Sequence, residues 1–297
     1  MEDQSKRCGY VAIIGRPNVG KSTLLNKIIA HKISITAAKP QTTRHQISGI
    51  KTFANTQVIY VDTPGVHSKQ QRLLNRCMNK LALKTMNGVD VVLFMTEGVA
   101  WTTEDEHILG YLKTISCPVI LAINKVDKID NKEKLLPYIE ELNKKMSFAK
   151  IIPISASQGT GIDVLEKALI EFMPVASFLF PTKQITDRND KFLAAEIIRE
   201  KIIRFLGQEL PYATTVIVDE FEHKTNTLRI SATIFVEREG QKVIIIGKKG
   251  VGLKKIGTLA RKDMEQLFHR KVFLTLWVKV KQSWSDDQRM LEQLGYN

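Results

Sequence analysis

The chain has 297 residues, of which 43% are hydrophobic and 25% charged. This length suits two ordinary domains of roughly 100–200 residues each. The sequence contains no apolar run near the ~20 residues that cross a bilayer, and its charged start does not read as a signal peptide. The cysteines lack CxxC spacing, which indicates reduced thiols in a cytoplasmic protein rather than a disulfide or zinc framework. They are Cys8, Cys77 and Cys117.

Positive charge is concentrated in one part of the chain. Between Lys242 and Lys281 there are 11 lysines and arginines against two acids, so this segment carries +9 of the total net charge of +13. Such an excess favours a polyanionic partner over a merely solvated surface.

The first half alternates short apolar runs with polar helical stretches. The runs are rich in Val and Ile and apolar on both faces, which is typical of a buried parallel sheet. Leu73–Met86 and Glu133–Lys145 are expected to form crossover helices, so residues 1–174 are predicted to be an α/β domain with a mixed, mostly parallel sheet. The predicted strands are Tyr10–Ile14, Gln57–Val61, Val89–Met95, Val119–Ile123 and Ile151–Ile154.

The pattern changes between Pro174 and Pro181, and residues 175–186 are predicted to be a linker. Residues 187–297 then predict an α+β module with a short C-terminal helix. Its expected elements are a helix over Asp190–Leu206, strands over Thr214–Asp219 and Thr227–Glu237, a Gly-rich turn, a helix over Val251–Phe268 and a strand over Val272–Lys281.

A phosphate-binding loop follows the first predicted strand. The run from Gly15 to Ser22 fits G-x-x-x-x-G-K-[ST] between a strand and a helical stretch. Its backbone N–H groups can cradle phosphates, Lys21 can reach the β- and γ-phosphates, and the Ser22 hydroxyl can bind Mg²⁺. The nucleotide-binding residues expected here are Gly15, Arg16, Pro17, Asn18, Val19, Gly20, Lys21, Ser22 and Thr23.

Three short motifs follow later strands in the order that a G-protein requires, at the strand ends where open α/β sheets bind ligands. Asp62 can hold Mg²⁺ through water, and the Gly65 N–H can sense the γ-phosphate. Asp127 can accept from guanine N1–H and N2–H₂, which favours GTP over ATP because a wrong base leaves a buried acceptor unpaired. The motifs are Asp62, Thr63, Pro64 and Gly65; Asn124, Lys125, Val126 and Asp127; and Ser155, Ala156 and Ser157, where the Ala156 N–H could meet guanine O6.

The polar loop Lys39–Arg44 is expected to close on Mg²⁺ and the γ-phosphate through Thr42 or Thr43, with Thr43 preferred. The predicted metal ligands are therefore Ser22, Thr43 and Asp62, and the predicted catalytic groups include Lys21, Thr43 and Gly65. Val66 stands where Ras-like enzymes carry the glutamine that orients water, which predicts slow intrinsic hydrolysis or another water-positioning group.

Together with these motifs, the run Ile244–Gly257 (IIIGKKGVGLKKIG) closely resembles the bacterial Era family of GTPases over essentially the whole chain. The resemblance implies a translation-factor-type GTPase domain joined to a type II KH domain, and a hydrophobic residue at position 66. It also implies binding of the 3′ end of small-subunit ribosomal RNA and a role in maturing the small ribosomal subunit. Relatives with a P-loop asparagine can use K⁺, so Asn18 is a candidate catalytic residue that binds K⁺.

The predicted RNA site is a GxxG loop, which in KH domains clamps about four nucleotides of single strand. Apolar residues before the loop can wall a groove for bases, and the lysines add charge. Lys242–Ile246 favours a strand by its β-branching whereas the KH template has a helix there, so this element is left open. The candidate RNA-binding residues are Ile246, Gly247, Lys248, Lys249, Gly250, Lys254 and Lys255.

Two tryptophans could also stack on bases, but Trp277 is expected to lie in the core because it belongs to an alternating strand; the other is Trp284. The function predicted is a GTP-hydrolysing, RNA-binding switch, monomeric and cytoplasmic. Two alternatives stay open. One is an RNA-binding protein whose GTP site is mainly structural, and the other is a peripheral membrane GTPase whose basic half docks on anionic lipid at the inner face of the membrane.

Overall fold

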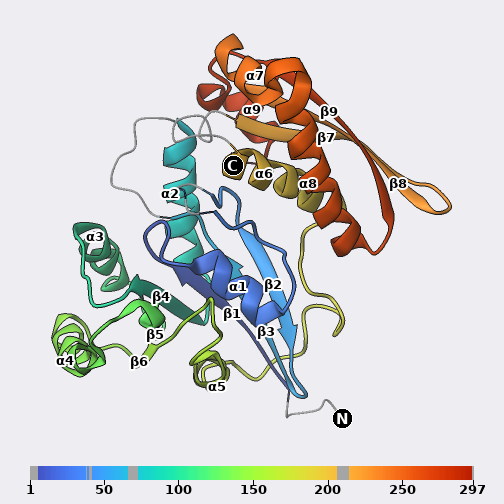
Figure 1. The fold of residues 1–297 in the computed structure, drawn as a ribbon. Helices are drawn as coiled ribbons and strands as arrows, with labels where there is room; N and C mark the ends of the chain where they lie inside the picture. The colour runs from blue at the N-terminus through green and yellow to red at the C-terminus, as the bar shows by residue number, and fades with distance from the viewer. Residues whose placement is uncertain (1–5, 38, 40–41, 66–72, 206–213, 296–297) are drawn as a thin grey trace. The chain divides into compact units, whose positions relative to one another are not determined.

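In the computed structural model, the described residues are 6–37, 39, 42–65, 73–205 and 214–295. They form two compact units, of which unit 1 comprises Met1–Ser34, Thr43–Gln70 and Asn75–Asp187. Unit 2 comprises Arg188–Asn297 together with two segments from the first half of the chain, Ile35–Thr42 and Gln71–Leu74. Figure 1 shows the elements of both units in chain order.

Unit 1 is an α/β domain with a sheet of strand order β2-β3-β1-β4-β5-β6, in which only β2 runs antiparallel to its neighbour among the described strands. This confirms the predicted mixed, mostly parallel sheet. The strands are β1 (Arg7–Ile14), β2 (Ile47–Thr52), β3 (Thr56–Asp62), β4 (Val91–Glu97), β5 (Val119–Asn124) and β6 (Lys150–Pro153). The helices are α1 (Lys21–Ile29), α2 (Leu73–Met86), α3 (Thr103–Leu112), α4 (Leu135–Lys145) and α5 (Ile162–Ile170), with 3₁₀ turns at Val126–Lys128 and Lys132–Lys134.

The core of unit 1 explains this arrangement. Side chains of α2, α3 and α4 pack in one apolar cluster with the central strands, as Met86, Leu109 and Leu142 do with Phe94 and Leu121. Helix α1 lies against β2, where a Cβ on Gly49 would come within 2.6 Å of Leu25. The sheet thereby holds the carboxyl ends of β1, β3, β4 and β5 at one edge.

The segment after Pro174 is fastened along unit 1. The Gln57 side chain accepts from the N–H groups of Leu179 and Phe180 and donates to the Phe180 carbonyl, at 2.9–3.0 Å. Farther on, Asp187 accepts from the hydroxyl and the N–H of Ser48. The boundary between the units therefore follows Asp187, after the whole of the predicted linker 175–186.

Unit 2 contains a sheet of strand order β7-β8-β9, with helices α6, α7 and α8 packed against it in one apolar cluster. Lys242–Ile246 belongs to helix α7, not to a strand. The unit comprises α6 (Asp190–Phe205), β7 (Thr214–His223), β8 (Thr227–Val236), α7 (Glu239–Ile246), a 3₁₀ turn at Lys248–Gly250, α8 (Val251–Phe268), β9 (Lys271–Val280), a 3₁₀ turn at Trp284–Asp286 and α9 (Gln288–Gln293).

Of the two tryptophans in unit 2, the one predicted to be buried is exposed, and the other is buried. Trp277 was predicted to lie in the core, and this is wrong: its residue surface is 59% exposed, because the aliphatic residues of β9 occupy the alternate positions that face the helices. Trp284 is fully buried, so it cannot stack on an RNA base.

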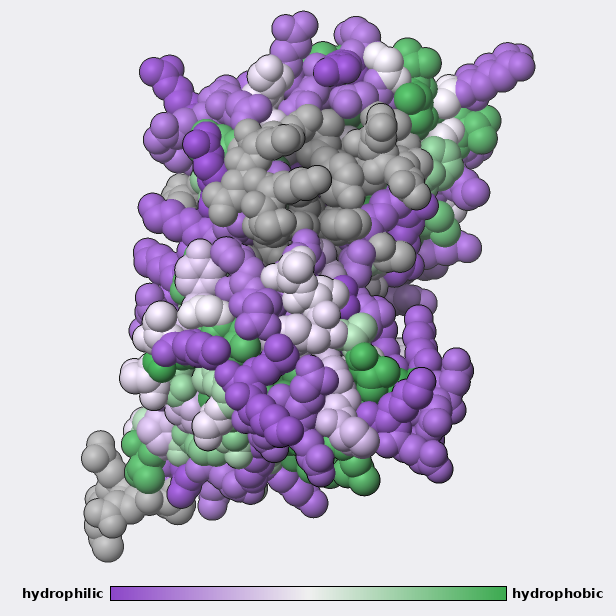
Figure 2. All heavy atoms as spheres, turned by 90° about the vertical axis from the view of Figure 1, so that its left-hand side faces the viewer, coloured by the Kyte–Doolittle hydropathy of each residue, from purple (hydrophilic) through white to green (hydrophobic). Residues whose placement is uncertain are grey.

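On the face drawn in Figure 2, hydrophilic residues dominate and hydrophobic residues lie between them in small groups. Within the described ranges, no helix combines the length and apolar character that spanning a bilayer requires.

Candidate functional site

The loop from Gly15 to Ser22 joins β1 to α1 and has the shape that its sequence predicts. Gly20 adopts φ 107°, and a Cβ there would lie 2.3 Å from Nδ2 of Asn124, so glycine is required on both grounds. Helix α1 begins at Lys21, which leaves the first N–H groups of the helix directed to this loop. Such a helix start favours the binding of a phosphate.

Lys21 is buried beneath the loop, where its ammonium group donates to the carbonyls of Gly15 (2.8 Å) and Arg16 (3.0 Å). Burial lowers the pKa of Lys21 from 10.5 to about 8, while the nearby Asp62 opposes this shift. The protein therefore pays an electrostatic cost to keep Lys21 charged, and a phosphate beside the ammonium would relieve it.

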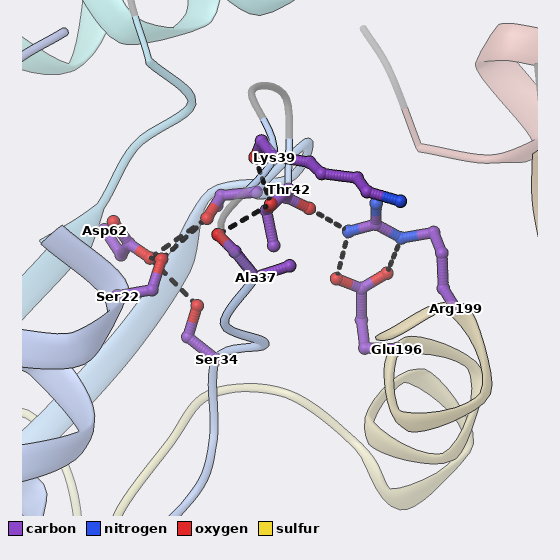
Figure 3. A network of polar contacts seen from close by, with 9 residues as sticks. Ser22, Ser34, Ala37, Lys39, Thr42, Asp62, Glu196 and Arg199 are labelled. Atoms are coloured by element: carbon purple, nitrogen blue, oxygen red, sulfur yellow. Dashed lines mark hydrogen bonds and ion pairs between the residues drawn. The ribbon is translucent and has the colours of Figure 1, made fainter. Parts of the chain in front are cut away.

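Asp62 gathers three hydroxyl groups on one of its carboxylate oxygens, Oδ2. Ser22 Oγ lies 2.7 Å from it, Ser34 Oγ 2.9 Å and Thr43 Oγ1 3.5 Å, as Figure 3 shows for Ser22 and Ser34. The other oxygen, Oδ1, is buried and has no hydrogen-bond partner among the described residues. Burial raises the pKa of Asp62 from 3.8, against the opposing effects of Lys21 and the hydroxyl donors.

This cluster fits Mg²⁺. A hard divalent cation takes oxygen ligands, and Asp62, Ser22 and Thr43 offer a carboxylate and two hydroxyls from three separate segments. A cation there would stabilise the charged form of Asp62, which burial disfavours. Ser34 was missed by the sequence analysis, because nothing in its local sequence distinguishes it from an ordinary loop serine.

The two threonines of the loop Lys39–Arg44 differ in their contacts. Thr43 Oγ1 lies 2.7 Å from Ser22 Oγ, whereas the Thr42 hydroxyl donates to the Lys39 carbonyl at 2.6 Å. The geometry thus favours Thr43 for the metal cluster. Gly65 is buried against the phosphate loop, since a Cβ on it would come within 2.9 Å of the Pro17 backbone. Val66 lies outside the described residues.

At the end of the site predicted to bind the guanine base, Asn124 forms hydrogen bonds that connect its own motif to two others. Its Nδ2 donates to the Val19 carbonyl of the phosphate loop at 2.7 Å, and its Oδ1 accepts from the Ala156 N–H at 2.9 Å. The N–H predicted to meet guanine O6 is therefore already engaged by Asn124. Asp127 is exposed in the turn after β5, where a base can reach its carboxylate.

Two acids near this end were missed by the sequence analysis. Glu97, the last residue of β4, pairs with Lys125 at 2.8 Å and with Arg16 at 3.5 Å. Asp105, fully buried in α3, also approaches Arg16, at 3.4 Å. Glu97 stands at the carboxyl end of a parallel strand, so the rule that placed the other motifs could have found it.

Unit 2 carries a groove between α8 and β9, next to the predicted GxxG loop. Gly250 (φ 81°) and Lys249 (φ 53°) adopt the left-handed conformation, and Gly247 also has a positive φ, of 71°. The groove has a volume of about 420 Å³. Its lining residues are Gly250, Leu253, Lys254, Gly257, Thr258, Arg261, Val272, Phe273, Leu274 and Leu276.

The predicted RNA residues occupy four different positions. Gly250 and Lys254 line the groove, and Lys248 and Lys249 are exposed on the loop at its end. Lys255 instead places its ammonium group 5.7 Å from the centre of the Phe205 ring. Ile246 is half-buried at the end of α7, and Gly247 follows it. The other polar lining residues, Thr258 and Arg261, follow Lys254 by four and seven positions, so helical periodicity could have identified them.

Comparisons with known proteins identify the family of both domains. The family described as 50S ribosome-binding GTPase matches residues 10–125, and the KH domain family matches residues 209–285. GTPase Era of Marinobacter nauticus is 56% identical over 294 residues, covering 99% of this chain and 96% of the relative. The chain belongs to the Era family of GTPases.

Relatives in the Era family extend this agreement. GTPase Era of Pseudomonas aeruginosa PAO1 is 55% identical over 290 residues, covering 98% of this chain and 95% of the relative. The solved structure of a single-substitution variant of Aquifex aeolicus Era bound to GDP·AlF₄⁻ matches with a TM-score of 0.94 at 40% identity, over 98% of this chain and 99% of that one. The chain is thus a GTPase with a P-loop domain followed by a KH domain, as predicted.

A second solved structure is that of Era in complex with MgGDPNP and nucleotides 1506–1542 of 16S ribosomal RNA. It matches with a TM-score of 0.95 at 40% identity, over 98% of this chain and 99% of that chain. The ligands of these relatives agree with binding of guanine nucleotide and Mg²⁺ by this family.

Proposed function

We propose that this GTPase is a molecular switch that grips single-stranded RNA at the 3′ end of small-subunit ribosomal RNA and assists maturation of the small ribosomal subunit. The observation that carries the proposal is the groove of unit 2, in which an exposed lysine pair at a GxxG loop stands beside apolar walls. A phosphate backbone suits the loop and unstacked bases suit the walls. The Era relative bound to nucleotides 1506–1542 of 16S ribosomal RNA supports the choice of RNA.

For the nucleotide, we assign the phosphates to the N–H groups of residues 15–23 and to Lys21. Ser22, Thr43 and Asp62 would hold Mg²⁺, which supplies charge neutralisation at the phosphates when bound. Lys21 and the loop N–H groups then stabilise the negative charge of the γ-phosphoryl group during in-line attack by water. Asp127 selects guanine, and Gly65 contacts the γ-phosphate through its N–H.

K⁺ at Asn18 is a finer part of the proposal. Asn18 is exposed and left-handed at φ 64° within the phosphate loop, so its side chain lies outside the packed core. We expect faster GTP hydrolysis in K⁺ than in Na⁺, and loss of this difference in Asn18→Ala. Equal rates in both salts would remove K⁺ from the mechanism.

The exposed lysines of the GxxG loop would also suit anionic lipid. We propose that most molecules are cytoplasmic monomers and that a fraction of them docks on the inner face of the cell membrane. Flotation with anionic vesicles in the presence of competing RNA tests this. The other alternative is an RNA-binding protein whose GTP site is mainly structural. Turnover of GTP measured with and without RNA tests it, because a structural site would show neither basal nor RNA-stimulated hydrolysis.

The main experiment measures binding of an oligonucleotide from the small-subunit ribosomal RNA 3′ end, with a GTP analogue and with GDP, at one stated salt concentration. The intact chain is compared with Lys248→Glu/Lys249→Glu. Lys132→Glu/Lys134→Glu, exposed lysines of unit 1, gives a matched control for the change in net charge. Tighter binding with the GTP analogue, lost only in the loop variant, supports the proposal. Weak binding that is the same in all three proteins would overturn it.

A further inference from the structure

The three-stranded sheet of unit 2 is covered by helices on one face. Along β9, the residues that pack into the helix-facing cluster are Val272, Leu274, Leu276, Val278 and Val280. The residues between them belong to the opposite face of the strand. Two of these are large aromatic side chains, Phe273 and Trp277, each 59% exposed.

The two aromatic rings share one face of one strand. They are four residues apart, which separates their Cα atoms by about 13 Å at the rise of an extended strand. Exposed aromatic residues on a sheet surface are how RNA-recognition modules stack two or three unpaired bases. Such stacking does not depend strongly on sequence, because every base offers a π-face.

Cations accompany the aromatic pair on this face. The Arg229 guanidinium lies 5.8 Å from the centre of the Phe273 ring, and the two residues are partners in the register of β8 and β9. Lys271 and Lys279 occupy the same face of β9 on either side of the rings, and both are exposed. These charges suit phosphates that run alongside stacked bases.

Acidic residues of this face belong to the far strand. Asp219 of β7 accepts from the Thr233 hydroxyl at 2.8 Å, and Glu222 of β7 pairs with Lys224 at 2.9 Å. In the strand order β7-β8-β9, β7 is two strands away from the aromatic row. The edge at β9 is therefore the basic and aromatic edge, which favours a single-stranded polyanion over a basic or purely apolar partner.

Strand β9 is also a wall of the GxxG groove, which Phe273, Leu274 and Leu276 help to line. It is the edge strand of its sheet. A strand of RNA lying in the groove can therefore pass over this edge onto the opposite face without leaving β9.

We propose that Trp277 forms a second base-stacking site for single-stranded RNA, which takes a base beyond those held in the GxxG groove, with Phe273 at the junction between the groove and this site. This inference rests on the proposed RNA-binding function and adds a separate surface to it. It predicts that the protein binds a longer stretch of single strand than the groove alone accommodates.

The test compares two RNAs on the full chain with a GTP analogue bound. One is a tetranucleotide that fills the groove, and the other is a 12-nucleotide strand containing the same four nucleotides. The variant Trp277→Leu keeps apolar bulk but removes the aromatic ring, and Trp277→Phe keeps an aromatic ring. Leu136→Ala/Val164→Ala, which changes exposed apolar residues of unit 1, is the matched control.

We expect Trp277→Leu to lose about tenfold in affinity for the long strand, with tetranucleotide affinity and GTP turnover unchanged, because Trp277 does not line the groove. The ring-retaining variant and the control should bind both RNAs as the intact chain does. Unchanged long-strand affinity in the leucine variant, or an equal loss for both RNAs, overturns the second site. Failure of the proposed function looks different, because neither RNA would then respond to Lys248→Glu/Lys249→Glu.

Discussion

Nη2 of Arg199, a buried residue of α6, donates a hydrogen bond to the backbone carbonyl of Thr42, as Figure 3 shows. Arg199 is fixed for this contact by two further hydrogen bonds of 2.7 Å to the Glu196 carboxylate. The next residue along the chain, Thr43, belongs to unit 1 and to the Asp62 cluster. One peptide bond therefore separates a residue held by α6 from a candidate magnesium ligand.

The first prediction concerns this junction. Arg204 of α6 also holds the segment Ile35–Thr42, since its guanidinium donates to the Thr36 carbonyl at 2.8 and 3.1 Å. In the double variant Arg199→Met/Glu196→Met and, separately, in Arg204→Ala, we expect the difference in RNA affinity between the GTP-analogue and GDP states to shrink. The reason is that the segment ending at Thr42 would lose its hydrogen bonds to α6, so a change in the position of Thr43 would no longer move α6.

The measurement is the ratio of RNA dissociation constants in the two nucleotide states. Replacing both members of the buried pair avoids an uncompensated charge, which alone costs about 3–5 kcal/mol. Because coupling is reciprocal, the effect of RNA on nucleotide affinity should fall by the same factor. Arg270→Ala, an exposed arginine of unit 2, controls for lost charge. A ratio equal to that of the intact chain in both variants would contradict the prediction.

The second prediction is a pH dependence from Lys21, whose pKa burial lowers to about 8. A bound phosphate favours the charged amine, so above pH 8 binding must take up a proton. We expect the affinity for GDP to fall by about tenfold between pH 7 and pH 9, since one pH unit above the pKa corresponds to a factor of ten. Binding measured by calorimetry in buffers of different ionisation enthalpy would register the proton uptake.

Titration of Lys21 affects protein stability and GDP affinity in opposite directions, because the free energy of unfolding rises with pH while GDP affinity falls. Between pH 8 and the ordinary value of 10.5, the unfolded chain binds more protons at Lys21 than the folded chain, so this group raises the free energy of unfolding as pH rises. The control for the GDP-binding experiment is Lys21→Met. This variant lacks the titrating amine, whereas any titration of the guanine base affects both proteins equally. If GDP affinity in both proteins changes equally with pH, Lys21 is not the group responsible.

The third prediction concerns base selection by Asp127. In Asp127→Asn, the side chain offers one donor in place of one acceptor, so the 2-amino group of guanine loses its partner while the 2-oxo group of xanthine gains one. We expect GDP affinity to fall by at least tenfold and XDP affinity to rise, since an unpaired polar group costs about 1–3 kcal/mol. Asp130→Asn, an exposed acid three residues on, is the control. GDP affinity unchanged from the intact chain would refute the assignment of Asp127 to the base.

The sequence predicted well what depends on neighbouring residues. The bounds of α2 and α8 agree with the prediction, and the phosphate loop is recognisable because strand, glycines and lysine follow one another directly. Lys242–Ile246 shows the limit of local propensity. Its β-branched residues favour a strand, yet Gln241 accepts from the N–H groups of Glu237 and Arg238 and so starts a helix, which buries Ile245.

Contacts between distant segments were not predictable in this way. Asn124 reaches Val19 across 105 positions, and no local pattern signals that contact. The place of Trp277 was predictable in principle, because the aliphatic residues Val272, Leu274 and Leu276 fall on the other parity of the strand. The parity of the whole strand identifies the buried face, whereas the hydrophobicity of a single tryptophan does not.

The fourth prediction concerns Glu97, whose carboxylate joins Arg16 of the phosphate loop to Lys125 of the base motif. In Glu97→Gln both cations lose their shared partner, so we expect the KM for GTP and the dissociation constant for GDP to rise together. These side chains are partly exposed, and such pairs contribute about 0–1 kcal/mol each, so the two pairs together limit the rise to about thirtyfold.

The turnover number kcat should stay constant in Glu97→Gln, because the carboxylate pairs with Arg16 and Lys125 rather than with Lys21 or the Asp62 cluster. Glu106→Gln is the matched control, since Glu106 pairs with Lys145 at 3.3 Å on the surface of the same unit. A fall in kcat at constant KM would mean that Glu97 acts on the reacting phosphate, and its assignment to nucleotide binding would be wrong.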